Sequence, residues 1–166
     1  IDFFHYLGRR SWLIEANLFA SQVRGRAEAI DEVQTSSARY FQRPDNTEAT
    51  YDPTRTSLGG HAGSLRLRRT AEKSGFRMQT GVAWRSPGFE INDLGYMNRA
   101  DEINQFGWAA YQRRNPIGPF NRLQVNANEW LDWDFSGNLL RRAANANASA
   151  TFRNNWQVGG SLTREM

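Results

Sequence analysis

Apolar and polar residues alternate along most of the chain, which is the pattern of strands with one apolar and one polar face. The clearest run is Leu139 to Phe152, where alanines at even positions oppose Asn, Ser and Thr at odd ones. Weaker alternating runs cover residues 2–7, 12–21, 62–70, 75–84, 104–112, 122–135 and 156–165. Glu129 breaks the alternation of its run and suggests a bulge or a local pairing. The sequence therefore predicts an all-β fold, an antiparallel up-and-down meander of eight strands.

Two long segments interrupt this rhythm, at residues 22–61 and 86–103. The first contains Gly25 to Gln34, which has the composition of a short helix. The second begins at Ser86-Pro87-Gly88, where proline removes a ladder donor and ends the strand. Up to Glu102 it holds five large apolar side chains and four carboxylates. Long segments of such defined composition are usually folded and often functional, so we expect two structured loops.

The lengths of the strands and connections narrow the fold further. Several strands run for about ten residues or more, near the ~9–11 that cross a bilayer at a tilt. Strands of soluble sandwiches are more often ~5–6 residues long. The connections after strands 1, 3 and 7 are short and those after strands 2 and 4 are long, as between the two sides of an outer-membrane barrel. The connection after strand 5 is intermediate, and that after strand 6, at Ser136–Asn138, is shorter than this rule predicts. These features predict part of a transmembrane outer-membrane β-barrel.

In such a barrel the polar faces of the strands line the lumen and the apolar faces meet lipid. The residues expected in the lumen are Arg66, Arg68, Arg77, Gln124, Asn126, Asn145 and Asn147. Four tryptophans share the parity of the apolar residues in their strands and are expected in two membrane-interface belts: Trp12, Trp84, Trp133 and Trp156. Trp108 should lie between the belts, and Trp130 should face inward.

Charge and composition limit the partners. The net charge is +4, and Lys73 is the only lysine, so arginine carries nearly all the positive charge. Arginine binds carboxylate and phosphate bidentately, which fits lipid headgroups, acidic glycans or nucleic acid. Alternation sets aromatic residues and arginines on opposite faces, which argues against base stacking, so no nucleic acid partner is expected. The absence of cysteine excludes a disulfide framework, and no apolar run reaches the ~20 residues of a membrane helix.

Candidate chemistry concentrates in the two long loops. The pairs Glu90 with Asp93, or Asp101 with Glu102, are of the type used for glycoside hydrolysis, but sequence spacing does not fix the separation that this reaction needs. We therefore expect no enzyme, no cofactor, and ion pairs instead. A calcium ion in loop 86–103 is the alternative, although no EF-hand spacing is present. The ion-pair or ligand candidates are Arg85, Glu90, Asp93, Arg99, Asp101, Arg39, Arg43 and Asp45. His5 and His61 lack the further ligands of a zinc site.

Several motifs in these loops are familiar. They are Ala38-Arg39-Tyr40-Phe41-Gln42-Arg43-Pro44-Asp45, Ser57-Leu58-Gly59-Gly60, and Ser86 to Tyr96 followed by Arg99-Ala100-Asp101. Between about Arg9 and Gln112 the chain resembles an uncharacterised Gram-negative family of outer-membrane β-barrels that follow an amino-terminal carbohydrate-binding module of the family-nine type. The resemblance implies that residues 1–166 are an internal portion of one longer barrel domain. It supplies no catalytic residues, and the carbohydrate-binding module lies outside this sequence.

Together these observations predict a barrel segment in the outer membrane of a Gram-negative bacterium. Its expected function is passage or capture of a solute, a saccharide if the resemblance holds. The expected partners are outer-membrane lipid, the saccharide and other envelope protein subunits. Two alternatives stay open. One is a structural barrel that docks another envelope protein through its loops, and the other is a soluble β-sandwich that binds carbohydrate.

Overall fold

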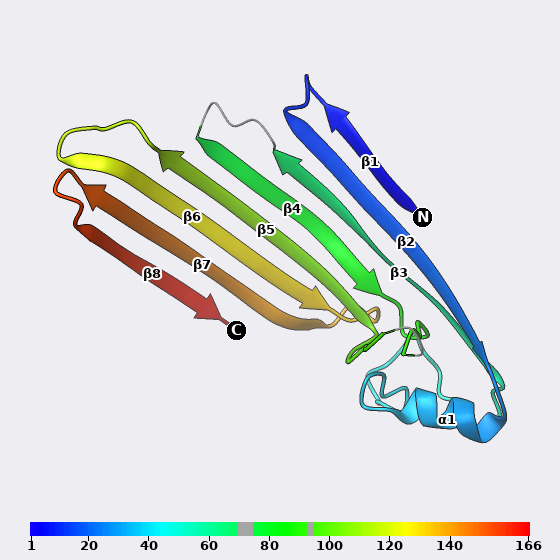
Figure 1. Ribbon diagram of the computed structural model, residues 1–166. Coiled ribbons are helices and arrows are strands. Elements are labelled where there is room, and N and C mark those ends of the chain that lie inside the picture. The colour runs from blue at the N-terminus through cyan, green and yellow to red at the C-terminus, as the bar shows by residue number, and fades with distance from the viewer. Residues whose placement is uncertain (70–74, 93–94) are drawn as a thin grey trace.

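The computed structural model describes residues 1–69, 75–92 and 95–166, and these form one antiparallel sheet in a single layer (Figure 1). Each strand pairs with its neighbours in sequence. The strands are β1 (Asp2–Leu7), β2 (Trp12–Arg24), β3 (Ser57–Arg69), β4 (Phe76–Arg85), β5 (Glu102–Arg113), β6 (Phe120–Trp133), β7 (Leu139–Phe152) and β8 (Gln157–Glu165). The predicted eight-stranded meander is therefore confirmed.

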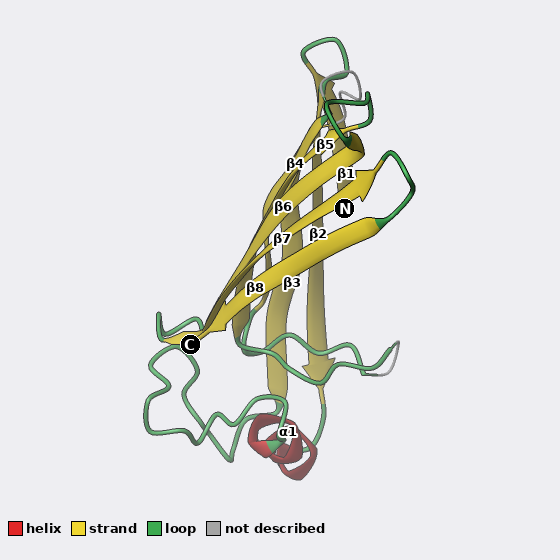
Figure 2. Cartoon of the chain, turned by 90° about the vertical axis from the view of Figure 1, so that its left-hand side faces the viewer, coloured by secondary structure: helices red, strands yellow, loops and turns green. Residues whose placement is uncertain are grey.

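The sheet is curved and twisted, but it is not closed (Figure 2). Strands β1 and β8 are its two edges and do not pair with each other. Helix α1 (Ala27–Thr35), the two long loops and the short β6–β7 turn lie at one end of the sheet, and the β1–β2, β5–β6 and β7–β8 connections lie at the other (Figure 1). Within the described residues, no helix combines the length and the apolar character that crossing a membrane requires.

Strands β2 and β3 are longer than the alternation predicts. Thirteen consecutive pairs join them, from Trp12 with Arg69 to Arg24 with Ser57. The connection between them therefore covers residues 25–56 rather than 22–61. The alternation fades over Gln22–Arg24 and Ser57–His61, yet the ladder continues because main-chain hydrogen bonds do not require alternating side chains.

The strand register assigns every side chain to one of two faces, because directly paired residues point to the same side of a sheet. One row joins Arg68, Gln79, Trp108, Asn128 and Asn145 across five strands. We call the face that carries this row the polar face and the opposite one the apolar face. All residues expected in the lumen lie together on the polar face: Arg66, Arg68, Arg77, Gln124, Asn126, Asn145 and Asn147. Trp12, Trp84 and Trp133 lie on the apolar face.

Strand β5 corrects one part of the expected pattern. Phe106 pairs with Gly81 and Trp108 pairs with Gln79, so both rings lie on the polar face and not between lipid-facing belts. There the Arg66 guanidinium lies 5.9 Å from the centre of the Phe106 ring. The argument that aromatic residues and arginines occupy opposite faces was therefore wrong. The sequence misleads here because Gly107 and the alanine pair at 109–110 give β5 almost no alternation of its own.

Burial on the two faces is inverted relative to a soluble sheet, in which the apolar face is normally covered. Val125 and Leu65 on the apolar face are each about half exposed, at 50% and 49%, and Leu162 is 76% exposed. On the polar face, Ser64 and Asp132 are buried at 6%. The apolar side of this sheet is therefore uncovered, while the polar side is where side chains crowd and loops fold.

Two small hydrophobic clusters attach the loops to the polar face. One joins Ile30 of α1 and Phe41 to Leu58 on β3. The other joins Phe89, Met97 and Ala100 of the β4–β5 loop to Ala62 on β3. Leu58 and Ala62 have the parity of the polar face, so both loops pack on that side. Loop 86–103 is thus structured, as expected, although Tyr96 is 91% exposed and Leu94 lies outside the described residues.

The second loop begins in close contact with the main chain of β3. The Ser86 amide donates to the carbonyl of His61, and the Ser86 hydroxyl accepts from the His61 amide, each at 2.8 Å. Beside this pair, a Cβ added to Gly60 would lie 2.1 Å from the amide nitrogen of Phe89. Only a residue without a side chain allows this approach, which explains the glycine.

We therefore expect Gly60→Ala to lift the β4–β5 loop from the sheet. Overpacking of this kind costs about 1–3 kcal/mol, and a loop that opens this readily should be cleaved roughly tenfold faster or more by trypsin at Arg99. Gly95→Ala is the matched control, because a Cβ there meets nothing within 4 Å. Equal cleavage rates in the two variants would contradict the close docking of the loop.

Candidate functional site

The long loops are joined by a buried ion pair. Arg39 of the β2–β3 loop and Glu90 of the β4–β5 loop approach to 2.6 Å, and their side chains are 1% and 11% exposed. Arg39 also donates to the main-chain carbonyl of Phe89 at 2.5 Å. Burial lowers the pKa of the Arg39 guanidinium from its usual value, and the neighbouring Glu90 carboxylate partly opposes that shift. The Arg39 side chain therefore holds the second loop at two points, the Glu90 carboxylate and the main-chain carbonyl of Phe89.

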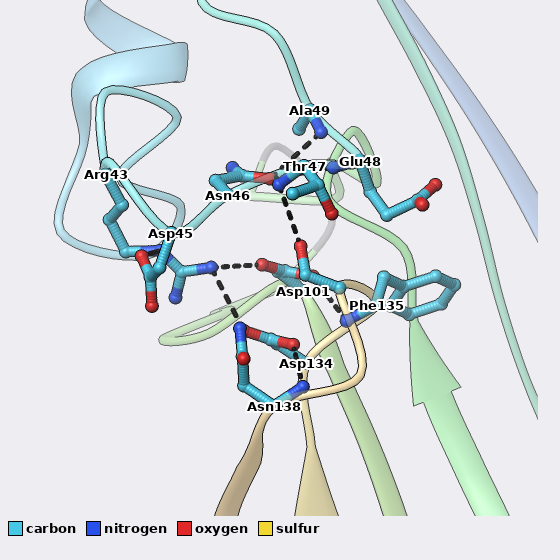
Figure 3. A network of polar contacts seen from close by, with 11 residues as sticks. Arg43, Asp45, Asn46, Thr47, Glu48, Ala49, Asp101, Asp134, Phe135 and Asn138 are labelled. Atoms are coloured by element: carbon cyan, nitrogen blue, oxygen red, sulfur yellow. Dashed lines mark hydrogen bonds and ion pairs between the residues drawn. The ribbon is translucent and has the colours of Figure 1, made fainter.

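A second arginine ties three segments together (Figure 3). Arg43 contacts Asp101 at 2.7 Å and Asp134 at 3.5 Å. Both carboxylates also hold main chain at the β6–β7 turn, because Asp101 accepts from the amide of Phe135 and Asp134 accepts from that of Asn138. The network thus connects both long loops to the turn at residues 134–138.

Backbone geometry prepares these contacts. The amide of Ala100 donates to the carbonyl of Ala38 at 2.8 Å, which aligns the two loops side by side. Asp101 follows with a φ of 54°, a left-handed conformation that Asp tolerates better than most residues. This turn directs the chain into β5 while the Asp101 side chain reaches Arg43 and the β6–β7 turn. A strained residue held by several contacts is common at functional sites.

A cavity of about 530 Å³ opens on the polar face beside the β4–β5 loop. Phe89 and Ile91 of the loop line it, together with strand residues of mixed polarity. The strand residues on the polar face are Asn17, Phe19, Ala62, Ser64, Arg66, Ala83, Arg85, Glu102 and Asn104. Apolar walls with a few polar groups that fix orientation are typical of small-solute sites. We take this cavity as the candidate functional site.

The arginines expected to bridge the loop carboxylates have other partners. Arg85 pairs with Glu102 at 2.6 Å, and Arg99 reaches the same carboxylate at 4.0 Å. Within the described residues neither contacts Glu90 or Asp101, which are held by Arg39 and Arg43 instead. Asp45 lies 3.5 Å from Arg43 at the exposed edge of the network. Asp93 lies outside the described residues.

Two important residues escaped sequence reasoning, Asp134 and Ser136. The Ser136 hydroxyl accepts from the amide of Thr47 at 3.0 Å, and Asp134 is almost completely buried. The signal available was Asp134 four residues before Asn138, a spacing at which an Asp side chain caps a tight turn. Nothing in a single sequence indicates that this turn meets a loop some ninety positions earlier.

The loop carboxylates are arranged as partners of arginine rather than as a reactive pair. Glu90, Asp101 and Glu102 each contact a guanidinium within 2.7 Å. Among the residues that the structure describes, no group of three or more His, Cys, Asp or Glu side chains is placed to hold a metal ion. The calcium alternative in loop 86–103 stays a prediction, since that loop includes the undescribed Asp93.

Sequence comparison places this architecture in a family. The model of a domain of unknown function, DUF5916, matches residues 20–166. The chain belongs to this family. The DUF5916 match includes both long loops and strands β3–β8, so it extends well beyond Gln112, where the resemblance noted above ends. Neither the search of curated proteins nor that of solved structures gave a match.

The buried pair of the DUF5916 chain gives a direct test of how the loops are held. Arg39→Gln should leave Glu90 buried without a cation and destabilise the docked loop by about 3–5 kcal/mol. Arg99→Gln removes an exposed contact and should cost at most about 1 kcal/mol. Hydrogen exchange of the amides at residues 86–101 measures both.

The double variant Arg39→Gln/Glu90→Gln separates a lost pair from a stranded charge. We expect it to be less destabilised than Arg39→Gln alone, because no charge then stays buried. Equal exchange in Arg39→Gln and Arg99→Gln would mean that the pair does not hold the loop.

Proposed function

We propose that this chain is a segment of an outer-membrane β-barrel whose polar face passes or captures a solute. The lipid of a Gram-negative outer membrane would cover the apolar face. The cavity beside the β4–β5 loop would be the place where the solute is first held. A saccharide fits its mixture of aromatic, amide and charged groups, as the resemblance to barrels behind a carbohydrate-binding module also suggests.

The inverted burial of the sheet carries this proposal. Leu18, Leu65 and Val125 are about half exposed on the apolar face, whereas Ser64, Gln112 and Asp132 are buried on the polar one. Exposed apolar patches of this extent mark surfaces that are covered by something other than water. Strands of 9–14 residues in β2–β8 are long enough to cross a bilayer at a tilt, which supports lipid as the cover.

The position of the loops supports a role in capture. Both long loops pack on the polar face at one end, where they would narrow a lumen. The ion pairs of Arg39 and Arg43 fix the loops there, so in a closed barrel they would form a permanent constriction. Loops held in this way give a solute a defined wall to bind, because their side chains do not have to be ordered on binding.

A soluble β-sandwich module is the second candidate, and the open sheet favours it. Strands β1 and β8 leave their outer edges unpaired among the described strands, and the apolar face would suit a second sheet. In that case the apolar residues would be covered by protein. A third possibility is a barrel that serves only as a scaffold. Conductance of the whole gene product in a planar bilayer distinguishes a conducting barrel from this one.

Cysteine scanning of β7 tests which face meets lipid; residues 1–166 contain no cysteine, and any cysteine elsewhere in the gene product is first replaced by serine. In liposomes that contain the whole gene product, a water-soluble maleimide should label Asn145→Cys and Asn147→Cys. The adjacent Ala146→Cys and Ala148→Cys should stay largely unlabelled, because lipid excludes the reagent. These neighbours are matched controls with opposite parity on one strand.

Depth-dependent quenching by brominated lipids gives a second reading of the same question. Variants that retain only Trp12 or only Trp84 should be quenched, because both rings lie on the apolar face. Labelling of both parities in β7, with both tryptophans unquenched, would reject the barrel and favour the soluble module.

A further inference from the structure

Charge on the polar face is not evenly neutralised. The described carboxylates of its central strands all have partners: Glu15 lies 3.7 Å from Arg68, Glu102 contacts Arg85, and Asp132 accepts from the Asn104 amide. Arg66 and Arg77 belong to the same face and lie in the same strands, β3 and β4. Within the described part of the chain, neither has a carboxylate within ion-pair distance. Arg66, Arg77 and also Arg122 on β6, which donates to Gln124, are therefore exposed cations of this face without an ion pair among the described residues.

Aromatic rings hold Arg66 and Arg77 in place. The Arg66 guanidinium lies 5.9 Å from the centre of the Phe106 ring, and the Arg77 guanidinium lies 5.5 Å from that of Trp108. Stacking on a ring uses the flat face of a guanidinium and leaves its N–H groups, which lie in its plane, free to donate. These donors are arranged in a fork that matches carboxylate and phosphate.

A glycine makes room for the Phe106 ring that lies beside Arg66. Gly81 pairs with Phe106, and a Cβ at Gly81 would lie 2.9 Å from the tip of the Phe106 ring. The missing side chain lets the ring lie across β4 toward Arg66, which is the partner of Gly81 on β3. The position of Arg66 is therefore set by three neighbouring strands. Arg66 also lines the candidate cavity, together with Asn17, Ser64 and Asn104.

Arg77 and the Trp108 ring lie farther along the same face of the sheet. Arg77 is four residues from Gly81 on β4, which corresponds to roughly 13 Å along an extended strand. Beside it the polar face carries uncharged amides, in which Asn147 donates to Asn126 at 2.8 Å and Asn128 donates to Asn145 at 2.5 Å. Arg66 and Arg77 therefore lie in sequence from the cavity toward the start of β4. Glu15 on β2 lies opposite Arg66 in the register, but its carboxylate is 3.7 Å from Arg68.

We propose that Arg66 binds the anionic group of the solute in the cavity. Arg77 is then a second binding position for the same anionic group, farther along the polar face. The solute is thus a small molecule that bears a carboxylate or a phosphate and whose remaining groups are polar. This proposal rests on the proposed function for the direction of passage. Recognition at Arg66 depends only on the cavity.

Binding of three matched sugars to the purified whole gene product tests the proposal by calorimetry. Glucuronate and glucose 6-phosphate carry the two anions, and glucose carries neither. We expect the anionic sugars to bind more tightly than glucose by about tenfold or more, since one charge-assisted hydrogen bond separates them. The comparison of glucuronate with glucose 6-phosphate shows which anion the site prefers.

Variants then identify the cation. Arg66→Gln should abolish the preference for the anionic sugar, while Arg66→Lys should retain part of it by keeping the charge. Arg122→Gln, on the same face but outside the cavity, should leave binding unchanged. Phe106→Leu should weaken binding without removing a charge, because the guanidinium loses the ring beside it.

The outcomes separate this inference from the proposed function. Equal affinity for glucuronate and glucose, or equal losses in Arg66→Gln and Arg122→Gln, would overturn the anion site. A chain that proves soluble without lipid but keeps an Arg66-dependent preference for anions would overturn the barrel and support the site. In a bilayer, Arg77→Gln should reduce the preference for anions in the conducted current, and an unchanged ratio of anion to cation current would remove Arg77 from the path.

Discussion

A single-layered sheet has no interior of its own, and this constraint governs the rest of the structure. Among the described strands, each one is hydrogen-bonded in a ladder to its neighbours in sequence, and β1 and β8 have one neighbour each. Because no second layer covers either face, each face must suit its own surroundings. The polar face does so with hydrogen-bonded amides and paired charges, whereas the apolar face presents Leu65, Val125 and Leu162 outward. The apolar face therefore requires a cover from outside the described residues.

The long loops solve a related problem at one end of the sheet. Each loop is too small to bury a core, and each supplies a few apolar side chains to a shared contact with β3. Ion pairs then join the two loops to each other, in addition to these hydrophobic contacts. Arg39 and Arg43 reach carboxylates on other segments, so removing one partner leaves the other desolvated without compensation. Such pairs add specificity of position, which a site at the end of a sheet needs more than it needs stability.

Two arginines on the polar face are likewise positioned by neighbouring side chains. Aromatic rings in β5 lie among polar neighbours, where they serve as supports for Arg66 and Arg77. On a solvated sheet face an unsupported arginine would sample many rotamers and lose entropy on binding an anion. A stacked guanidinium has already lost much of that freedom, so its donors are preorganised. The glycines at positions 81 and 60 play corresponding roles for a ring and for a loop.

The sequence by itself determined the local structure wherever the pattern was strong. The bounds of the strand Leu139–Phe152 were predicted correctly, and helix α1 lies within one or two residues of its expected position. The weak alternation of 104–112 could not assign Phe106 and Trp108 to a face, and pairing with β4 decided it. The ion pairs were also beyond the sequence, because Arg39 and Arg43 meet carboxylates more than fifty positions away, and many arginines compete for them. Alternation is a property of neighbouring residues, so it can be read along the chain. The choice of face, loop docking and charge partners depends on strand register and chain reversal, which only the tertiary structure decides.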